Sequence, residues 1–219
     1  MAATVTATRL TDPTWLAEQV DLQALLWKTD DRRVLATLWW YSASTVLVAP
    51  SLSALVATGV ARSPRLQDTV LQRHPSGRLL AARSTAVLGP DITELGSALE
   101  STLGTIIDAL GPFTGGRTRP LWAIGTDAIA NSLLWAGRES GCVDEATGLA
   151  APIAAAAPGS RLPVPRYVDV PRASAAPPAR FVRRASCCLL YRVPGQSLCT
   201  SCPRRDPAER LDLLRAAAG

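Results

Sequence analysis

The sequence predicts an α+β fold, mainly helical, with a small antiparallel sheet and a separate cysteine-rich segment at the C-terminal end. Three observations predict it. Several apolar runs repeat with the 3.6-residue period of a helix, two short apolar runs flank a turn sequence, and four of the five cysteines lie close together near the C-terminus. With 219 residues, 47% of them hydrophobic, the chain can bury a sizeable core.

The first helices are expected in the N-terminal quarter. Asp12 and Pro13 are typical of an N-cap and a first helical position. Two buried helices are predicted next, at about 30–49 and 50–61, because Pro50 suits the first turn of a helix and not its interior. Together they form an uncharged stretch long enough to span a membrane, but serine and threonine dilute it, so we expect no stable membrane insertion.

A hairpin and a capped helix are predicted after these helices. Residues 66–72 and 78–87 flank the turn sequence of residues 74–77, as in a β-hairpin. Asp91 and Glu94 then have the spacing of a capping box, and an apolar helical period follows them.

The chain is expected to divide into three parts. Residues 1–148 form a helical or α+β main body, and residues 149–179, rich in Ala and Pro, form a connection that holds little core. A short strand is expected within it, at 167–170. Residues 180–219 form the C-terminal segment, which ends in a short helix that begins at Asp206.

Composition limits the classes of function. Charged residues make up 19% of the chain, and the net charge of +5 comes almost wholly from arginine. Because no basic stripe interleaved with aromatic residues occurs, we expect no nucleic-acid partner. The N-terminus lacks a basic region followed by an apolar run, so a cytoplasmic, reducing location is expected, where cysteines are thiols or metal ligands.

The cysteines carry the chemistry. Cys187 and Cys188 are adjacent in a predicted strand over 180–192, and ten residues separate them from the Cys-x-x-Cys pair of Cys199 and Cys202. Adjacent residues of a strand point to opposite faces, so they do not easily grip one small ion. A binuclear cluster relaxes this demand because neighbouring thiolates can reach different irons, and four thiolates match a [2Fe–2S] centre.

The segment from Arg184 to Pro203 resembles the C-terminal signature of the FhuF-type ferric siderophore reductases, described by Cys-Cys-x10-Cys-x2-Cys. The resemblance covers about the last forty residues. It implies a [2Fe–2S] cluster on Cys187, Cys188, Cys199 and Cys202. It further implies a cytoplasmic protein that reduces iron(III) held by a siderophore of the hydroxamate type.

The surrounding residues fit electron transfer. Six arginines and no carboxylate lie between residues 180 and 205. Nearby positive charge favours a reduced cluster, and it would steer an acidic ferredoxin or an anionic iron complex. The candidates for this electrostatic role are Arg183, Arg184, Arg192 and Arg204. No Rossmann or Walker fingerprint occurs, so the electron is expected to come from a separate donor protein such as a ferredoxin.

Two rival hypotheses stay open. In the first, the four thiolates hold a structural zinc ion in a binding protein. In the second, Cys199 and Cys202 form the redox pair of a thiol–disulfide oxidoreductase, although the βαβ context of such enzymes is absent.

Other residues are interpreted more simply. His74 is expected in a solvated turn and Cys142 as an idle thiol. The tryptophans are expected mostly in the core, with Trp39 or Trp40 as a candidate for lining a siderophore cleft. Arg117 and Arg119 are plausible contacts for a substrate or partner and belong to no motif.

Overall fold

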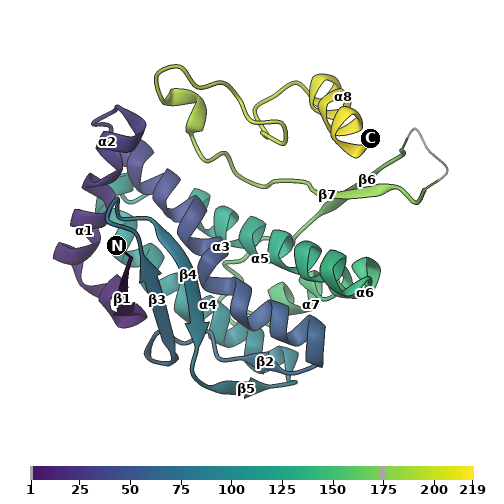
Figure 1. Ribbon diagram of the computed structural model, residues 1–219, viewed down its shortest axis with the longest axis horizontal. Helices are drawn as coiled ribbons and strands as arrows, with labels where there is room; N and C mark the ends of the chain where they lie inside the picture. Colours follow the sequence, from purple (N-terminus) through teal and green to yellow (C-terminus); the bar gives the residue numbers. More distant parts are fainter. Residues whose placement is uncertain (1, 173–175) are drawn as a thin grey trace.

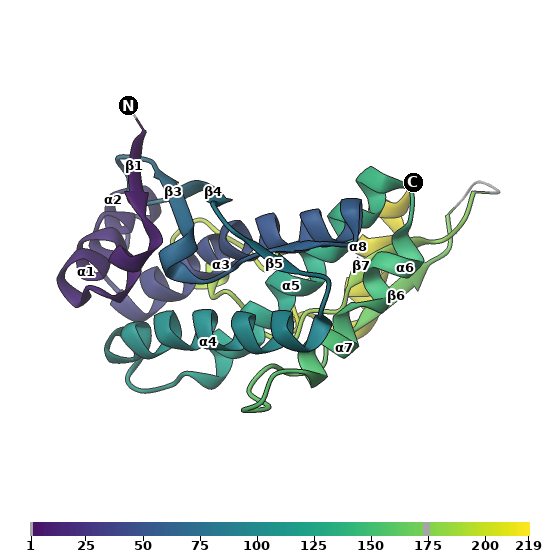
Figure 2. The ribbon, with the colours of Figure 1, turned by 90° about the horizontal axis from the view of Figure 1, so that it is seen from below.

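Two long helices, α3 (Arg32–Thr58) and α5 (Arg119–Ser140), pack against each other at the centre of the fold. The computed structural model describes residues 2–172 and 176–219. Helix α4 (Ile92–Leu110) lies on one side of this pair, and the β3–β4 hairpin lies on the other (Figures 1 and 2). The C-terminal segment runs back across α5 and α3 (Figure 1).

The remaining elements are short. The other helices are α1 (Pro13–Asp21), α2 (Gln23–Trp27), α6 (Val143–Gly148), α7 (Ala150–Ala155) and α8 (Pro207–Ala218). The strands are β1 (Ala3–Thr6), β2 (Ala61–Arg62), β3 (Thr69–Arg73), β4 (Leu79–Ser84), β5 (Val87–Gly89), β6 (Tyr167–Val170) and β7 (Ala179–Val182). The 3-10 turns are Ala7–Thr11, Leu66–Asp68, Gly111–Thr114 and Leu190–Arg192.

All strand pairs in the described residues are antiparallel. They form a three-stranded sheet in the order β1-β3-β4 and two two-stranded ladders, β2-β5 and β6-β7. The predicted hairpin is confirmed: β3 and β4 flank a turn in which His74 N–H donates to Arg78 O and Gly77 has a φ of +81°. The mainly helical α+β class with small antiparallel sheets is therefore confirmed.

Aspartates begin four of the helices. Asp12, Asp31, Asp91 and Asp206 each accept hydrogen bonds through a carboxylate oxygen from backbone N–H groups of the following turn. These bonds satisfy donors that have no partner inside the helix. Three of these caps were predicted from the sequence, and that of Asp31 was not.

Helix α3 differs from the prediction of two helices divided at Pro50. It is continuous from Arg32 to Thr58, with Pro50 inside it. A proline costs about 3 kcal/mol in a helix interior. Leu47 and Leu52 are buried on either side of it, and each contributes about 1.5–3 kcal/mol. Keeping one apolar face in the core therefore outweighs the lost hydrogen bond.

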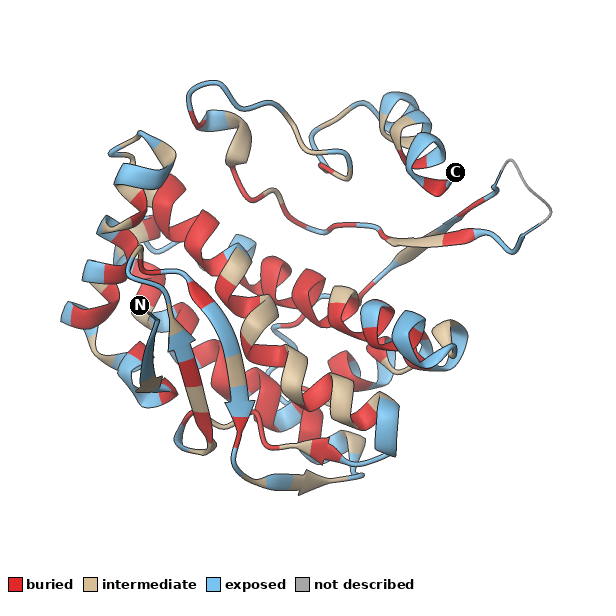
Figure 3. Cartoon of the chain, in the orientation of Figure 1, coloured by how far each residue is buried: buried red, intermediate tan, exposed pale blue. Residues whose placement is uncertain are grey.

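By length and composition α3 is also the one helix, among the described residues, that could cross a membrane. In this fold it lies against α5, with much of its surface buried in the core (Figure 3).

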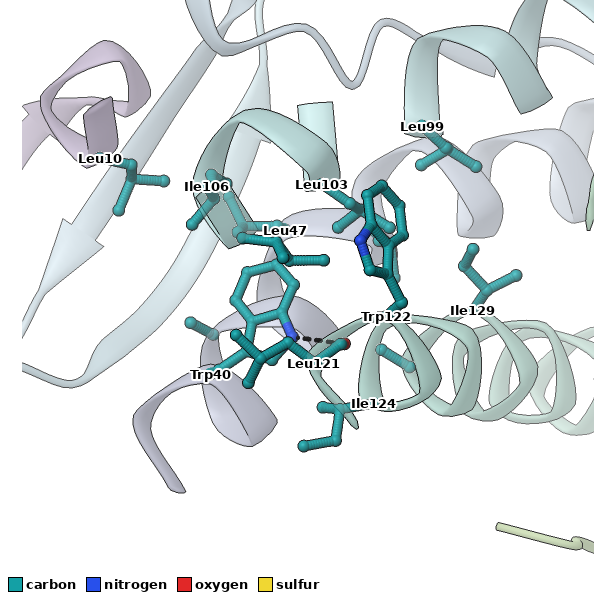
Figure 4. Close-up of a cluster of buried hydrophobic side chains, with 14 of the residues drawn as sticks. Leu10, Trp40, Leu47, Leu99, Leu103, Ile106, Leu121, Trp122, Ile124 and Ile129 are labelled. Carbon is teal, nitrogen blue, oxygen red and sulfur yellow. Dashed lines mark hydrogen bonds between the residues drawn. The ribbon is translucent and has the colours of Figure 1, made fainter. Parts of the chain in front are cut away.

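The core lies between α3, α4 and α5. Trp40 is fully buried there, and its indole N–H donates to Leu121 O at 2.8 Å, which links α3 to the start of α5 (Figure 4). Trp39 is 2% exposed and donates to Gly77 O in the hairpin turn. Both indoles therefore pack in the core, and neither lines the cavities described below.

The Ala/Pro-rich stretch contributes more to the core than expected. Ala150–Ala155 forms α7, and Ile153 is fully buried in the main core cluster. Alanine is a good helix former, and Gly96 of α4 lets the backbone of α7 approach closely: a Cβ at Gly96 would lie 2.5 Å from Ile153 O. The strand at 167–170 is confirmed as β6. Residues 173–175 of this stretch lie outside the described residues, and the division at 148 and 179 stays a prediction.

Candidate cysteine-ligated site

The four clustered cysteines lie in irregular chain and not in a strand. The predicted strand over 180–192 is wrong beyond Val182, where β7 ends. Leu189 adopts the left-handed conformation, with a φ of +65°, and a 3-10 turn follows it. A strand would place Cys187 and Cys188 on opposite faces of a ladder, whereas the left-handed residue after them lets the chain curl around its own sulfurs.

The sulfurs of the four cysteines lie in two pairs. The Sγ atoms of Cys187 and Cys202 are 3.7 Å apart. The sulfurs of Cys188 and Cys199 lie 4.0 Å and 3.3 Å from the same nitrogen of Arg184, Nη1. Each pair therefore joins one of the adjacent cysteines to one member of the Cys-x-x-Cys motif. Among the described residues, no group of three or more Cys, His, Asp or Glu side chains is placed to hold one metal ion.

A backbone N–H group also points at one of the sulfurs. Leu189 N–H donates to Cys187 Sγ at 3.4 Å. Hydrogen bonds of this kind stabilise negative charge on sulfur and are one of the means by which proteins set the potential of iron–sulfur clusters.

Arg184 is the cation of the site. One of its terminal nitrogens, Nη1, lies 3.3 Å from Cys199 Sγ and 4.0 Å from Cys188 Sγ. Its side chain is 3% exposed, so its charge acts in a medium of low dielectric constant, where it is weakly screened. The guanidinium therefore favours thiolate at the pair formed by Cys188 and Cys199.

The main body holds Arg184 in place. Asp127, on α5, lies with its Oδ2 3.6 Å from Arg184 Nε, and its carboxylate accepts hydrogen bonds from the N–H groups of Ala185 and Ser186. On α3, the ring of Tyr41 lies under the guanidinium, 4.6 Å from its carbon. One carboxylate thus fixes both the side chain of Arg184 and the backbone that leads to Cys187.

The pKa shifts follow from these contacts. Burial raises the pKa of Asp127 to about 6, while the backbone N–H of Ala185 and the charge of Arg184 act in the opposite direction. Without metal, the hydrogen bond from Cys199 lowers the pKa of Cys188, and the charge of Arg184 also lowers it. The same hydrogen bond, together with burial, raises the pKa of Cys199.

One donor of Arg184 is left without a partner among the described residues. Its Nη2 group is buried and makes no hydrogen bond, whereas Nε, which makes none either, faces the carboxylate of Asp127 at 3.6 Å. A buried, unpaired donor on a charged group is costly, which indicates that an anionic group belongs beside it. An all-cysteine [2Fe–2S] cluster carries a charge of about −2 when oxidised and exposes sulfide acceptors, so the residues present fit such a group.

The other predicted cations are dispersed. Arg183 is exposed, and Arg192 lies 4.0 Å from Asp31 at the start of α3. Arg204 stacks over the ring of Tyr191 at 5.4 Å. Arg180, one of the six arginines between residues 180 and 205, pairs with Asp169 on the neighbouring strand. Of the four candidates, Arg184 is the one whose guanidinium contacts the cysteine sulfurs among the described residues.

Two cavities flank the cysteine loop. One, of about 280 Å³, is lined by Cys187, by residues at the start of α3 and by the loop before α5. The other, of about 210 Å³, lies between the β6–β7 hairpin and α8 and is lined by four arginines, Arg166, Arg183, Arg184 and Arg210. A larger cavity of about 580 Å³ lies between α3 and β4, and no cysteine lines it.

Sequence reasoning missed Asp127 and Tyr41. The signal for Asp127 was available, because it is the single charged residue in the mostly apolar run from Leu121 to Ala130. Such a buried carboxylate requires a cationic partner from elsewhere in the chain. No comparable signal in the sequence marks Tyr41, because its contact with Arg184 depends on how the C-terminal segment packs against α3.

A cysteine-rich loop with a buried arginine beside its sulfurs is thus laid across a helical body. Residues 184–204 match the family described as the FhuF 2Fe-2S C-terminal domain, and the match contains Arg184 and all four clustered cysteines. The C-terminal segment is therefore of the FhuF type, and its cofactor is a [2Fe–2S] cluster. No curated protein matches the chain.

Proposed function

We propose that the protein is a one-electron reductase of ferric siderophores, which uses a [2Fe–2S] cluster to release iron(II) in the cytoplasm. The observation that supports it most is that the buried guanidinium of Arg184 contacts the sulfurs of Cys188 and Cys199, while those of Cys187 and Cys202 form a second pair. A redox centre of this kind suits a substrate that must gain one electron and lose its affinity for oxygen ligands.

The four cysteines are the proposed ligands, and their pairing assigns them to separate irons. Cys187 and Cys202 would hold one iron, and Cys188 and Cys199 the other. This assignment follows the Cys187–Cys202 contact and the common contact of Cys188 and Cys199 with Arg184, and it leaves each adjacent cysteine on a different iron. Tetrahedral zinc would instead require four sulfurs to converge on one point, which two separate pairs do not favour.

The pairing also argues against a thiol–disulfide oxidoreductase. In such an enzyme the sulfurs of Cys199 and Cys202 would face each other. Here the sulfur of Cys202 lies 3.7 Å from that of Cys187, and the sulfur of Cys199 lies beside the guanidinium of Arg184.

The chemistry of iron explains the release. Iron(III) is a hard cation that hydroxamate and carboxylate oxygens bind tightly, whereas iron(II) binds them less well. When bound, the cluster supplies a carrier that accepts and donates one electron at a time. A separate donor protein of the ferredoxin type would provide that electron, and the iron of the substrate would pass from the +3 to the +2 state.

The protein's own residues would bind and orient the reactants. Arg184 and the N–H group of Leu189 stabilise charge on the cysteine sulfurs. Asp127 fixes the loop that carries Cys187, and the exposed Arg183 and Arg192 offer positive charge to an acidic donor.

The decisive experiment is single-turnover reduction of a ferric hydroxamate by protein purified without oxygen and reduced with dithionite. A red-brown protein that yields one iron(II) per reduced cluster supports the proposal. Colourless protein that contains zinc and reduces nothing would refute it.

A further inference from the structure

The cavity beside Cys187 is formed by four separate parts of the chain. It has a volume of about 280 Å³ and lies between the start of α3, the loop before α5, the residues before the first cysteine pair and those after the second. Among its lining residues are Arg33, Thr37, Arg117, Ser186, Cys187 and Arg204. A concave site assembled from several segments suits a small molecule better than a protein surface.

The charged residues that line this cavity are all positive. Arg33, Arg117 and Arg204 line it, and no carboxylate does. Within residues 2–172 and 176–219, neither Arg33 nor Arg117 forms an ion pair, and Arg204 makes only its stacking contact with Tyr191. Three guanidinium groups without an acid among them attract an anion, because each can donate two parallel hydrogen bonds to a carboxylate.

Cys187 joins this cavity to the sulfur cluster of the loop. Its side chain is half-buried and lines the cavity, whereas Cys188 and Cys202 are buried, at 3% and 1% exposed. The sulfur of Cys199 lies 3.3 Å from Arg184 Nη1, and Cys199 is not among the residues that line the cavity. A molecule in the cavity would therefore meet one proposed ligand, Cys187, and none of the other three.

We propose that this cavity binds the ferric chelate, and that it selects chelates bearing free carboxylates and a net negative charge. The proposal rests on the proposed function and adds the charge of the substrate to it. Three hydroxamates neutralise iron(III), so a tris-hydroxamate centre offers no charge to the arginines. The negative charge must come from carboxylates at its edge, which Arg33, Arg117 and Arg204 would hold with the iron towards Cys187.

The test separates binding from reduction. Gallium(III) has the charge and nearly the size of iron(III) but is not reduced under these conditions, so its chelates report binding alone. Affinities of the cluster-loaded protein would be measured for two gallium chelates, a citrate-based dihydroxamate of net negative charge and a tris-hydroxamate of net positive charge. We expect the anionic chelate to bind more tightly, with an affinity that falls as salt is added.

The variants are Arg33→Gln, Arg117→Gln and Arg204→Gln, and the matched control is Arg83→Gln, an exposed arginine of β4 that does not line this cavity. Each test variant should weaken binding of the anionic chelate about fivefold, and the control should leave it unchanged. Unchanged affinity in all three, or equal affinity for the cationic chelate, would overturn the proposal.

A second measurement places the ligand. Chromium(III) chelates are paramagnetic and exchange slowly, so one bound beside Cys187 should speed the electron-spin relaxation of the reduced cluster, and the arginine variants should lose this effect. If the variants instead impair only electron delivery by the donor protein, the cavity is a donor site and the proposal is wrong. Binding without reduction of the matching ferric chelate would refute the reductase function and leave the binding site standing.

Discussion

The Nε atom of Arg184 lies 3.6 Å from Oδ2 of Asp127, and both side chains are 3% exposed. Arg184 belongs to the C-terminal segment and Asp127 to the central helix α5, so a buried ion pair connects the cysteine loop to the main body. Two charged side chains that are buried away from water are stable only when each is paired with the other. The first two predictions concern this pair.

Replacing Asp127 by Ala should destabilise the cluster-free protein by about 3 kcal/mol, because it leaves a buried guanidinium without a carboxylate. Urea unfolding followed by circular dichroism measures the change. Glu139→Ala, at the exposed end of the same helix, is the control and should change stability by less than about 0.5 kcal/mol. In the cluster-loaded protein Arg184 would keep an anionic neighbour, so Asp127→Ala should lower its stability by less. An equal loss of stability in the cluster-loaded and cluster-free proteins would contradict this account.

Replacing Arg184 by Gln should lower the reduction potential of the cluster. The guanidinium stabilises added negative charge near Cys188 and Cys199, and losing about 1.4 kcal/mol of that preference corresponds to about 60 mV for one electron. Redox titration followed by electron paramagnetic resonance measures the shift. Arg183→Gln, one residue earlier and exposed, should shift the potential by much less. Equal shifts would mean that general surface charge, and not this contact, sets the potential.

Chemical analysis should find about two irons and two acid-labile sulfides per chain in protein purified without oxygen, as a [2Fe–2S] centre on four cysteines requires. Iron without labile sulfide would point to a mononuclear site. That result would contradict the assignment of the four cysteines to a [2Fe–2S] cluster.

The five cysteines should separate into two groups. Replacing Cys187, Cys188, Cys199 or Cys202 by Ala should abolish the cluster or make it very labile, and ferric-siderophore reduction should be lost with it. Cys142→Ala should leave colour and activity intact, because Cys142 precedes α6 and belongs to neither sulfur pair. Iron content, visible spectra and single-turnover reduction of all five variants provide the test. Reduction retained in a colourless Cys199→Ala protein would refute the proposed electron route.

The hairpin β6–β7 should make a small, pH-dependent contribution to stability. A hydrogen bond from Arg180 holds the pKa of Asp169 below its usual value. The pair therefore stabilises the fold above the unfolded pKa of about 4, and the contribution is lost as the pH falls through the folded pKa. Asp169→Asn should lower the free energy of unfolding by about 0.5 kcal/mol or less at pH 7, since Asp169 is half-exposed, and should not change it in strong acid. Thermal unfolding of both proteins between pH 2 and pH 7 tests this. Their stabilities should differ by at most ~0.5 kcal/mol at neutral pH and become equal as the pH falls.

Local signals were enough for the elements whose structure depends on near neighbours. The aspartate caps at Asp12, Asp91 and Asp206 and the turn at Gly77 were predicted because hydrogen bonds within a few residues decide them. The spacing of the four cysteines likewise indicated a binuclear cluster, since the number and separation of thiolates are properties of the chain itself.

The tertiary structure decided what depends on contacts between distant residues. Helix α3 continues through Pro50 because burying one long apolar face in the core stabilises the helix by more than the proline destabilises it. The pairing of Cys187 with Cys202 depends on how the loop curls at Leu189, which no local pattern predicted. The choice of Arg184 over its neighbours depends on Asp127, 57 positions earlier in the chain, because burial makes a charge dependent on the partner that the fold provides.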